Sequence, residues 1–337
     1  MNTSFAATAS TGVVGQTNGG LLQRRIGKLW QALGPLVIFI VMFGIVAILT
    51  PTFVGGGGVT IVASSAAPIL LVALGQAFVL NIGSIDLSNA AITVLGAILL
   101  AMTLGPLGAV APLLVLVIVT LFGAVNGLLV AYMQVPSFAL TLGTLGIFQS
   151  AALVVSGATT VYVESNGELV SWLYTTAIAS LPMTFLLGVI VAVVAWLFLR
   201  FTRPGQGMTA IGKNESGAIF SAVRNRGLKV VAYALSGFMA GLAGTTIIAQ
   251  AGSASPMGLG SDLLLPGIAA AIVGGTSISG GVMNPINVIF GALTVALVPI
   301  ATTALHFDPS TQNLVYGVVI IVVVALTLTR SRSATVK

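Results

Sequence analysis

The sequence predicts an all-α polytopic membrane protein with about ten transmembrane helices, some of them broken or re-entrant, and with both termini in the cytoplasm. Of its 337 residues, 57% are hydrophobic and only 5% are charged, a composition that soluble domains do not have. All 12 Lys and Arg residues fall in three clusters, at residues 24–28, 200–229 and 330–337, and long charge-free stretches lie between them. Because short loops rich in Lys and Arg stay in the cytoplasm, an even number of spans is expected between neighbouring clusters.

Six spans are expected before the central cluster. A transmembrane helix needs about 20 mostly apolar residues. The stretch 29–85 carries no charge and is long enough for two helices, 87–163 is long enough for three, and a sixth fits at about 176–199. The breaks between these helices are expected at Pro and Gly residues, namely Pro51, 55–58, Gly105-Pro106 and Val135-Pro136-Ser137.

Four spans are expected after the central cluster, at about 230–250, 263–282, 286–305 and 312–328. Six and four are both even numbers, as the distribution of basic residues requires.

The chain is expected to form one membrane domain with two short tails. Residues 1–28 are predicted to be a disordered, basic N-terminal tail, because 1–20 are rich in Thr, Ser, Gly and Ala. Residues 29–330 form the transmembrane domain, which contains the hydrophilic segment 200–229, and 331–337 form a basic C-terminal tail. The apolar run that follows the first tail is too long for the core of a cleaved signal peptide.

Two classes of function are excluded by composition. The chain has no Cys, which excludes disulfides and Cys-ligated metal or redox sites. The basic residues gather at expected membrane boundaries and are not spread over a surface with interleaved aromatic residues, so no nucleic-acid partner is expected.

The central segment 200–229 is the longest hydrophilic stretch inside the hydrophobic blocks, so a soluble partner is expected to touch it. Gly207, Gly212 and Lys213 have the spacing of a phosphate-binding loop. The next residue is Asn214, where such a loop needs Ser or Thr to hold the metal ion, and the segment follows a membrane helix instead of a strand. A nucleotide site is therefore not expected in this chain.

A short helix at about 214–223 is the preferred interpretation, with Asn214 as its N-cap and Glu215 in its first turn. Such a helix would lie across the inner mouth of the protein and fit a groove on a cytosolic partner. The alternative is that the segment only connects two spans. The candidate contact residues are Lys213, Asn214, Glu215, Ile219, Phe220 and Arg224, with Ile219 and Phe220 as apolar anchors.

A polar break interrupts the first half of the chain at residues 81–89, Asn-Ile-Gly-Ser-Ile-Asp-Leu-Ser-Asn. Asp86 is the ionisable residue that this topology places deep in the membrane, where it must be buried in protein or line a cavity. We expect its carboxylate to accept hydrogen bonds from the following backbone amides and to cap the next helix beside Ser88. Direct contact with a solute and proton coupling are the two alternatives.

Further neutral polar groups lie inside the expected spans, at Asn126, Thr141 and Thr144. Uncharged amides and hydroxyls suit a polar neutral solute, although a Thr hydroxyl in a helix usually bonds its own backbone. Two pairs of Gly spaced four residues apart, beginning at Gly123 and Gly237, are expected to let helices pack closely. The candidate residues of a solute pathway are Asn81, Ser84, Asp86, Ser88, Asn126, Phe138, Thr141 and Thr144.

The outer face is expected to be acidic. Glu164 and Glu168 fall in an outer loop, and Asp262 and Asp308 fall near outer helix ends. These acids are expected to be ordinary solvated charges, and a docking surface for an external partner is the alternative. His306 is expected to be solvated at an outer helix end without clustered ligands, so neither a catalytic residue, a metal site nor a cofactor is expected.

Four segments together carry a resemblance to a known family. They are Gly83-Ser-Ile-Asp-Leu-Ser88, Val135-Pro-Ser-Phe-Ala-Leu-Thr-Leu-Gly-Thr-Leu145, Ala210-Ile-Gly-Lys-Asn-Glu215 running into Tyr233-Ala-Leu-Ser-Gly-Phe-Met-Ala-Gly-Leu-Ala-Gly244, and Gly260-Ser-Asp-Leu-Leu-Leu-Pro-Gly-Ile-Ala-Ala-Ala-Ile-Val-Gly-Gly-Thr-Ser-Ile-Ser-Gly-Gly281. In this order they resemble the membrane permease of bacterial ABC importers of the ribose, galactose and xylose type, within the superfamily of branched-chain amino acid and sugar permeases. The resemblance extends over about residues 33–330.

The resemblance implies a permease subunit that does not hydrolyse ATP and that lies, as a multi-pass protein, in the lipid of the bacterial cytoplasmic (inner) membrane. Two copies, or two related permeases, would pair with a cytosolic ATP-binding cassette ATPase and receive the solute from an extracytoplasmic solute-binding protein. The first motif, at 83–88, would lie near the translocation path and favours a sugar, that is, a pentose, a hexose or a related furanose. The ATPase-coupling segment would fall on 210–226.

The chain departs from the family pattern in three places. Ser84 stands where the family has Gly, Asn89-Ala90 where it has Val-Gly, and Ser216-Gly217 where it has Ala-Ala. These departures bear on the local backbone shape, on the substrate and on the packing of the coupling helix. The same type of permease for a nucleoside, a branched-chain amino acid or a furanone signal is the alternative. An ion-coupled secondary transporter ranks lower because Asp86 has no cationic partner at depth. A membrane enzyme ranks lower because His306 has no clustered ligands.

Overall fold

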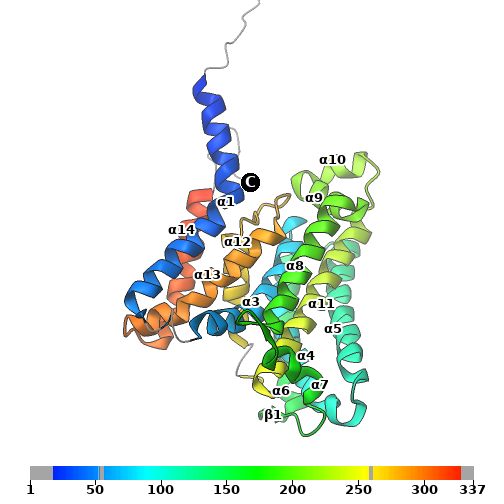
Figure 1. Ribbon diagram of the computed structural model, residues 1–337. Helices are drawn as coiled ribbons and strands as arrows, with labels where there is room; N and C mark the ends of the chain where they lie inside the picture. The colour runs from blue at the N-terminus through cyan, green and yellow to red at the C-terminus, as the bar shows by residue number, and fades with distance from the viewer. Residues whose placement is uncertain (1–17, 52, 54–56, 258–260, 328–337) are drawn as a thin grey trace, which may run out of the picture.

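The computed structural model describes residues 18–51, 53, 57–257 and 261–327, and these are almost entirely helical (Figure 1). Ten of the α-helices fall at the ten expected spans, and the protein is all-α and polytopic, as predicted. They are α1 (Asn18–Leu49), α3 (Gly58–Asn81), α4 (Asn89–Leu107), α5 (Val110–Tyr132), α6 (Ser137–Ser156), α8 (Met183–Phe201), α11 (Asn225–Ala251), α12 (Leu264–Val273), α13 (Pro285–Ala304) and α14 (Gln312–Thr327).

Seven of these helices are long and apolar enough to cross a membrane, namely α3, α4, α5, α6, α8, α11 and α13. Within the described residues, the apolar part of α1 comprises Leu33–Leu49, and α14 extends to Thr327, the last described residue. Helix α12 has 10 residues and is shorter than a full span, so the described part of the chain is a polytopic membrane domain with at least one short helix.

Three predicted boundaries are wrong. The eighth span was expected at 263–282, but α12 ends at Val273, because the chain then turns through glycines that include the positive-φ Gly275, Gly280 and Gly281. The sixth helix begins at Met183 instead of 176, because β2 (Ala177–Ile178) and β3 (Leu181–Pro182) form a hairpin before it.

The N-terminal tail was expected to be disordered over 1–28, but α1 already begins at Asn18. The run Leu-Leu-Gln-Arg-Arg at residues 21–25 favours helix, although Gly19, Gly20 and Gly27 do not. The remainder of that tail and the C-terminal tail at 331–337 lie outside the described residues.

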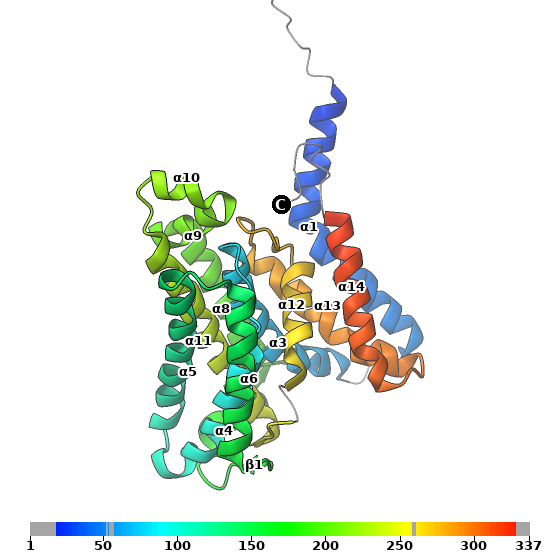
Figure 2. The ribbon, with the colours of Figure 1, turned by 180° about the vertical axis from the view of Figure 1, so that it is seen from behind.

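The two ends of the molecule carry different short elements (Figures 1 and 2). At one end, here called the inner end, α9 (Arg203–Lys213) and α10 (Glu215–Phe220) lie on the same side as the start of α1 and the end of α14. At the opposite, outer end lie α7 (Glu168–Thr175) and the antiparallel ribbon of β1 (Val161–Tyr162) and β4 (Ser253–Ala254). The 3₁₀ turns Ser261–Leu263 and Pro309–Thr311 precede α12 and α14.

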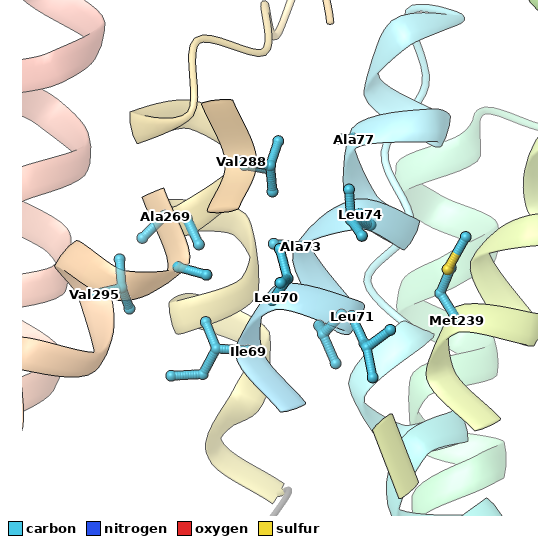
Figure 3. Close-up of a cluster of buried hydrophobic side chains, with 14 of the residues drawn as sticks. Ile69, Leu70, Leu71, Ala73, Leu74, Ala77, Met239, Ala269, Val288 and Val295 are labelled. Atoms are coloured by element: carbon cyan, nitrogen blue, oxygen red, sulfur yellow. The ribbon is translucent and has the colours of Figure 1, made fainter. Parts of the chain in front are cut away.

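The core is built around α3, which is buried along almost its whole length. A helix that is apolar on all sides is expected at the centre of a membrane domain. Figure 3 shows its Leu70, Leu71 and Leu74 between Met239 of α11 and Val288 of α13. This central position places the end of α3, and the break that follows it, inside the protein.

Helices α5 and α11 lie with their backbones in close contact. A Cβ atom added to Gly123 would lie 2.2 Å from the carbonyl oxygen of Tyr233, and one added to Gly237 would lie 2.3 Å from that of Val119. Larger side chains at either Gly would push the two helices apart. The close packing expected from the two Gly pairs is therefore present.

Candidate functional site

The break loop (residues 81–89) leaves α3 at its inner end and leads into α4. Gly83 adopts a left-handed φ of +74°, and its amide and that of Ser84 bond back to the carbonyls of Leu80 and Val79. This arrangement closes the end of α3 and turns the chain back into the protein.

Asp86 is fully buried at the centre of a polar network. Its Oδ1 accepts hydrogen bonds from the amide of Ser88 at 3.0 Å and from the hydroxyl of Ser88 at 2.6 Å, and its Oδ2 accepts one from the hydroxyl of Ser236 at 2.8 Å. Behind these hydroxyls, Asn126 donates to Ser88 at 2.8 Å and Asn89 donates to Ser236 at 2.6 Å. Each carboxylate oxygen therefore ends a chain of two hydrogen bonds whose dipoles point towards it.

This network takes the place of a positive counter-charge. The ion pair found within the described residues joins Lys229 and Glu215 and does not involve Asp86. A buried carboxylate without donors would be very costly in an apolar surrounding, and the Ser and Asn side chains supply the donors. Ser88 is the N-cap residue of α4 and makes no side-chain cap bond, and Asp86 accepts the Ser88 amide in the turn before the helix, so a capping role for Asp86 stays a prediction.

Helices α3, α6 and α11 make further hydrogen bonds to the break loop. The carbonyl of Ile85 accepts hydrogen bonds from the Tyr233 hydroxyl of α11 at 3.2 Å and from the Thr141 hydroxyl of α6 at 3.3 Å. Its amide donates to the hydroxyl of Ser137 at 3.2 Å. The side-chain amide of Gln76 in α3 donates to the carbonyl of Asp86. The loop is thus held by α3, α5, α6 and α11 together.

The structure brings four of the eight expected pathway residues to this network, namely Asp86, Ser88, Asn126 and Thr141. Thr141 is buried beside Ile85 and also bonds the Ser137 carbonyl of its own helix at 2.8 Å. Thr144 bonds the carbonyl of Thr141 at 3.4 Å, so both hydroxyls satisfy helix backbone, as the alternative interpretation allowed. Phe138 is 55% exposed at the start of α6 and takes no part in the network.

Asn81 connects the break loop to the inner end. Its amide donates to the hydroxyl of Thr209 in α9 at 3.2 Å, and its carbonyl accepts from the amide of Gly281 at 2.9 Å. A Cβ atom added to Gly212, near the end of α9, would lie 1.9 Å from the Asn81 oxygen. The end of α3, the end of α9 and the loop after α12 therefore meet through their backbones.

An inner cleft of about 970 Å³ opens between the ends of α5 and α6 and the segment formed by α10 and the start of α11. Ser84 lies in its wall, opposite residues of the central basic cluster. Arg226 lies over the ring of Tyr132, with its Cζ 5.6 Å from the ring centre. Glu215 and Arg224, two of the expected coupling residues, also line the cleft.

The central segment contains the expected short helix. The Oδ1 of Asn214 accepts a hydrogen bond from the amide of Gly217 at 3.0 Å, as an N-cap does. Phe220 is 91% exposed and Ile219 is 56% exposed, and Lys213 is exposed just before the helix. The helix was expected to reach residue 223 but ends at Phe220, because the chain turns through Ala222 with a φ of +57°.

Sequence reasoning missed α9, which precedes this helix. The signal was present, because Thr202 caps the helix through the amide of Gly205 at 3.2 Å and Pro204 lies in its first turn. It also missed Ser236 and Tyr233, which hold Asp86 and Ile85. These are polar residues inside an apolar span, but local sequence does not show which loop they face.

The acidic residues of the outer end are solvated. Glu164 and Glu168 are exposed beside and within the first turn of α7. Asp308 accepts a hydrogen bond from the amide of Ser310 at 2.8 Å, and the hydrogen bonds from Ser310 lower the pKa of this carboxyl. Asp262 and His306 are exposed at the outer ends of α12 and α13.

Known transport permeases are similar to this chain over most of its length. The family described as branched-chain amino acid transport system / permease component matches residues 58–324. The D-allose transport system permease protein of Escherichia coli is 31% identical over 304 residues, which cover 88% of this chain and 91% of that protein. The ribose import permease protein of Haemophilus influenzae is 30% identical over 305 residues, or 89% of this chain and 94% of that protein.

A third relative is the autoinducer 2 import system permease protein of Photorhabdus luminescens, which is 29% identical over 291 residues, or 86% of this chain and 87% of that protein. No solved structure matches the chain.

Proposed function

We propose, from the premise that this chain belongs to the family of branched-chain amino acid transport system permease components, that it is the permease subunit of a binding-protein-dependent ABC importer for a sugar. The observation that carries the proposal is the match of about nine-tenths of the chain to permease proteins of D-allose and ribose import. A furanone signal is the second candidate, and the third relative, an autoinducer 2 import permease, favours it.

Helix α6 is proposed to line the translocation path. Gln149 and Ser150 are exposed near its outer half, and Cβ atoms added to Gly143 or Gly146 would meet no heavy atom within 4 Å. An exposed side-chain amide is unfavourable in lipid, so this face is expected to meet water and a second permease copy. Uncharged amide and hydroxyl groups also suit a polyhydroxylated, neutral solute.

The inner end is proposed to face the cytoplasm and to bind the ATPase. The central basic cluster lies there, together with the described ends of the chain at α1 and α14. Helix α10 presents Phe220 and Ile219 to solvent at this end, and two exposed apolar side chains on a short helix suit a groove on a partner. ATP hydrolysis is assigned to that partner chain.

The outer end is proposed to receive the solute from an extracytoplasmic binding protein. Glu164 and Glu168 are exposed there, beside Tyr162 and Trp172, which are 68% and 48% exposed. Aromatic side chains next to solvated charges are typical of protein interfaces.

The test is reconstitution in proteoliposomes of the permease with its ATPase and its binding protein. The binding protein is first screened by thermal shift against pentoses, hexoses, autoinducer 2 and branched-chain amino acids. The ligand that shifts its melting temperature should then stimulate ATP hydrolysis and accumulate inside the vesicles. Accumulation of a branched-chain amino acid and of no sugar, or ATP hydrolysis by the permease alone, would overturn the proposal.

A further inference from the structure

We infer that Glu215 is a positioning residue that fixes the direction of α10 relative to α11, so that movement of α10 reaches the break loop and Asp86. The inference rests on the proposed function, in which α10 binds the ATPase. A contact of the ATPase with α10 would then act on the break loop, which the ATPase does not touch.

Helix α10 needs such a fixing contact because it is short and is joined to α11 by a turn. It has six residues, and residues 221–224 lead from it into α11 without helical structure. The turn contains Ala222 with a left-handed φ of +57°. The backbone bonds of this turn close the end of α10, but a connection of this kind acts as a hinge unless side chains hold the two helices together.

Glu215 holds them together through two donors of α11. Its Oε1 accepts hydrogen bonds from the Nζ of Lys229 at 2.7 Å and from the Nδ2 of Asn225 at 3.2 Å. Asn225 and Lys229 are four residues apart and lie on one face of the helix. The Lys229 side chain is only 18% exposed, whereas Glu215 is 49% exposed. An ion pair so open to water contributes little to the free energy of folding. We therefore expect it to affect the direction of α10 relative to α11 and not the stability of the protein.

The same face of α11 continues from this clamp to the break loop. The residues Asn225, Lys229, Tyr233 and Ser236 follow one another at helical spacings of four, four and three. Tyr233 donates to the carbonyl of Ile85, and Ser236 donates to Asp86. At about 1.5 Å per residue, roughly 16 Å of helix separates the first of these contacts from the last.

Helix α11 is also suited to transmit a displacement as a rigid body. Its backbone lies against α5 at Gly123 and Gly237, where neither helix has room for a Cβ atom. Helix α5 carries Asn126, which belongs to the Asp86 network. A shift of the inner end of α11 is therefore expected to move two of the four helices that hold the break loop.

The experiment uses the assembled complex of permease, ATPase and binding protein in proteoliposomes, and measures ATP hydrolysis and solute uptake in the same vesicles. Glu215→Ala and Lys229→Met leave the apolar anchors Ile219 and Phe220 in place and should lower the solute imported per ATP several-fold. Lys229→Arg should retain coupling, and the exchanged pair Glu215→Lys with Lys229→Glu should restore part of it. Gln206→Ala, which removes an exposed hydrogen bond to the Arg200 carbonyl at the same end, is the matched control.

A second measurement examines the hinge directly in the permease alone. Spin labels on cysteines placed at Ser221 and Met133, both exposed, should give a narrow distance distribution that broadens in Glu215→Ala. Unchanged import per ATP and an unchanged distribution in Glu215→Ala would overturn the inference. Loss of the ATPase from the unsubstituted permease would instead overturn the proposed function, which separates the two failures.

Discussion

The hydroxyl of Ser236 in α11 lies 2.8 Å from the Oδ2 of Asp86, a residue 150 positions earlier in the chain. This bond joins the break loop to the helix that starts beside α10. It therefore connects the most polar point of the interior with the end proposed to bind the ATPase.

Substitutions of Asp86 should show whether transport needs its negative charge or only an acceptor oxygen for the surrounding donors. Asp86→Asn keeps one acceptor oxygen and should retain partial transport. Asp86→Leu leaves the hydroxyls of Ser88 and Ser236 without their acceptor, and each buried unsatisfied group costs about 1–3 kcal/mol. Thermal unfolding in detergent and solute uptake measure the two effects. Ser236→Ala, which removes only one of the two hydrogen-bond chains, should fall between them, and normal uptake by all three variants would refute the role of the network.

Replacement of Gly212 should disturb the junction between α9 and the break loop. The Cβ atom of Gly212→Ala would lie 1.9 Å from the Asn81 oxygen and 2.3 Å from the Gly281 amide nitrogen. Overpacking of this kind costs about 1–3 kcal/mol, so the melting temperature should fall. Gly227→Ala is the matched control, because a Cβ atom there meets nothing within 4 Å and Ala favours helix. Equal melting temperatures for the two variants would show that the contact of Gly212 with Asn81 and Gly281 adjusts without loss of stability.

Phe220→Asp should release the ATPase from the inner end. Phe220 is 91% exposed, and an aromatic anchor in an interface contributes about 2 kcal/mol or more. Copurification in detergent and solute-stimulated ATP hydrolysis should both be lost, while the melting temperature of the permease stays unchanged. Ser221→Asp adds the same charge at the adjacent exposed position without removing the ring and should retain both activities. If the Phe220 variant retains both, α10 is only a connector.

Cysteine labelling should place the two ends of the molecule on opposite sides of the membrane. The chain contains no Cys, so single cysteines at Ser165 and Ser216 can be labelled without background. Both positions are exposed, the first next to α7 and the second in α10. A membrane-impermeant maleimide applied to intact cells should label the first and not the second. Labelling of both positions would contradict the proposed orientation.

Replacement of Gln149 should affect the solute path without affecting the ATPase. Gln149→Leu removes an exposed amide from the outer half of α6 and should lower solute uptake while copurification of the ATPase stays normal. Val154→Leu, on the same helix and 80% exposed, is the apolar control. Normal uptake by Gln149→Leu would remove this face of α6 from the proposed path.

The positions of the long apolar helices could be predicted because each depends on local composition, that is, on apolar stretches between Pro, Gly and basic residues. The span expected at 263–282 ran past the end of α12, because it was drawn from apolar composition, whereas Gly274-Gly275 ends the helix through the left-handed φ of Gly275. The N-cap at Asn214 could be predicted, since a capping side chain bonds an amide only three residues further along the chain. Ser236, the partner of Asp86 in α11, could not be predicted, since helix packing brings it to Asp86 from a distant part of the chain.

The separation of Asp86 from Ser236 also constrains how the protein is made. At about 5–20 residues per second, Ser236 is synthesised roughly 8–30 s after Asp86. During that interval α3 and α4 are already complete, but the carboxylate between them lacks one of its donors. Until α11 is inserted, another donor has to take the place of Ser236, so the break loop reaches its final packing only once the second half of the membrane domain is present.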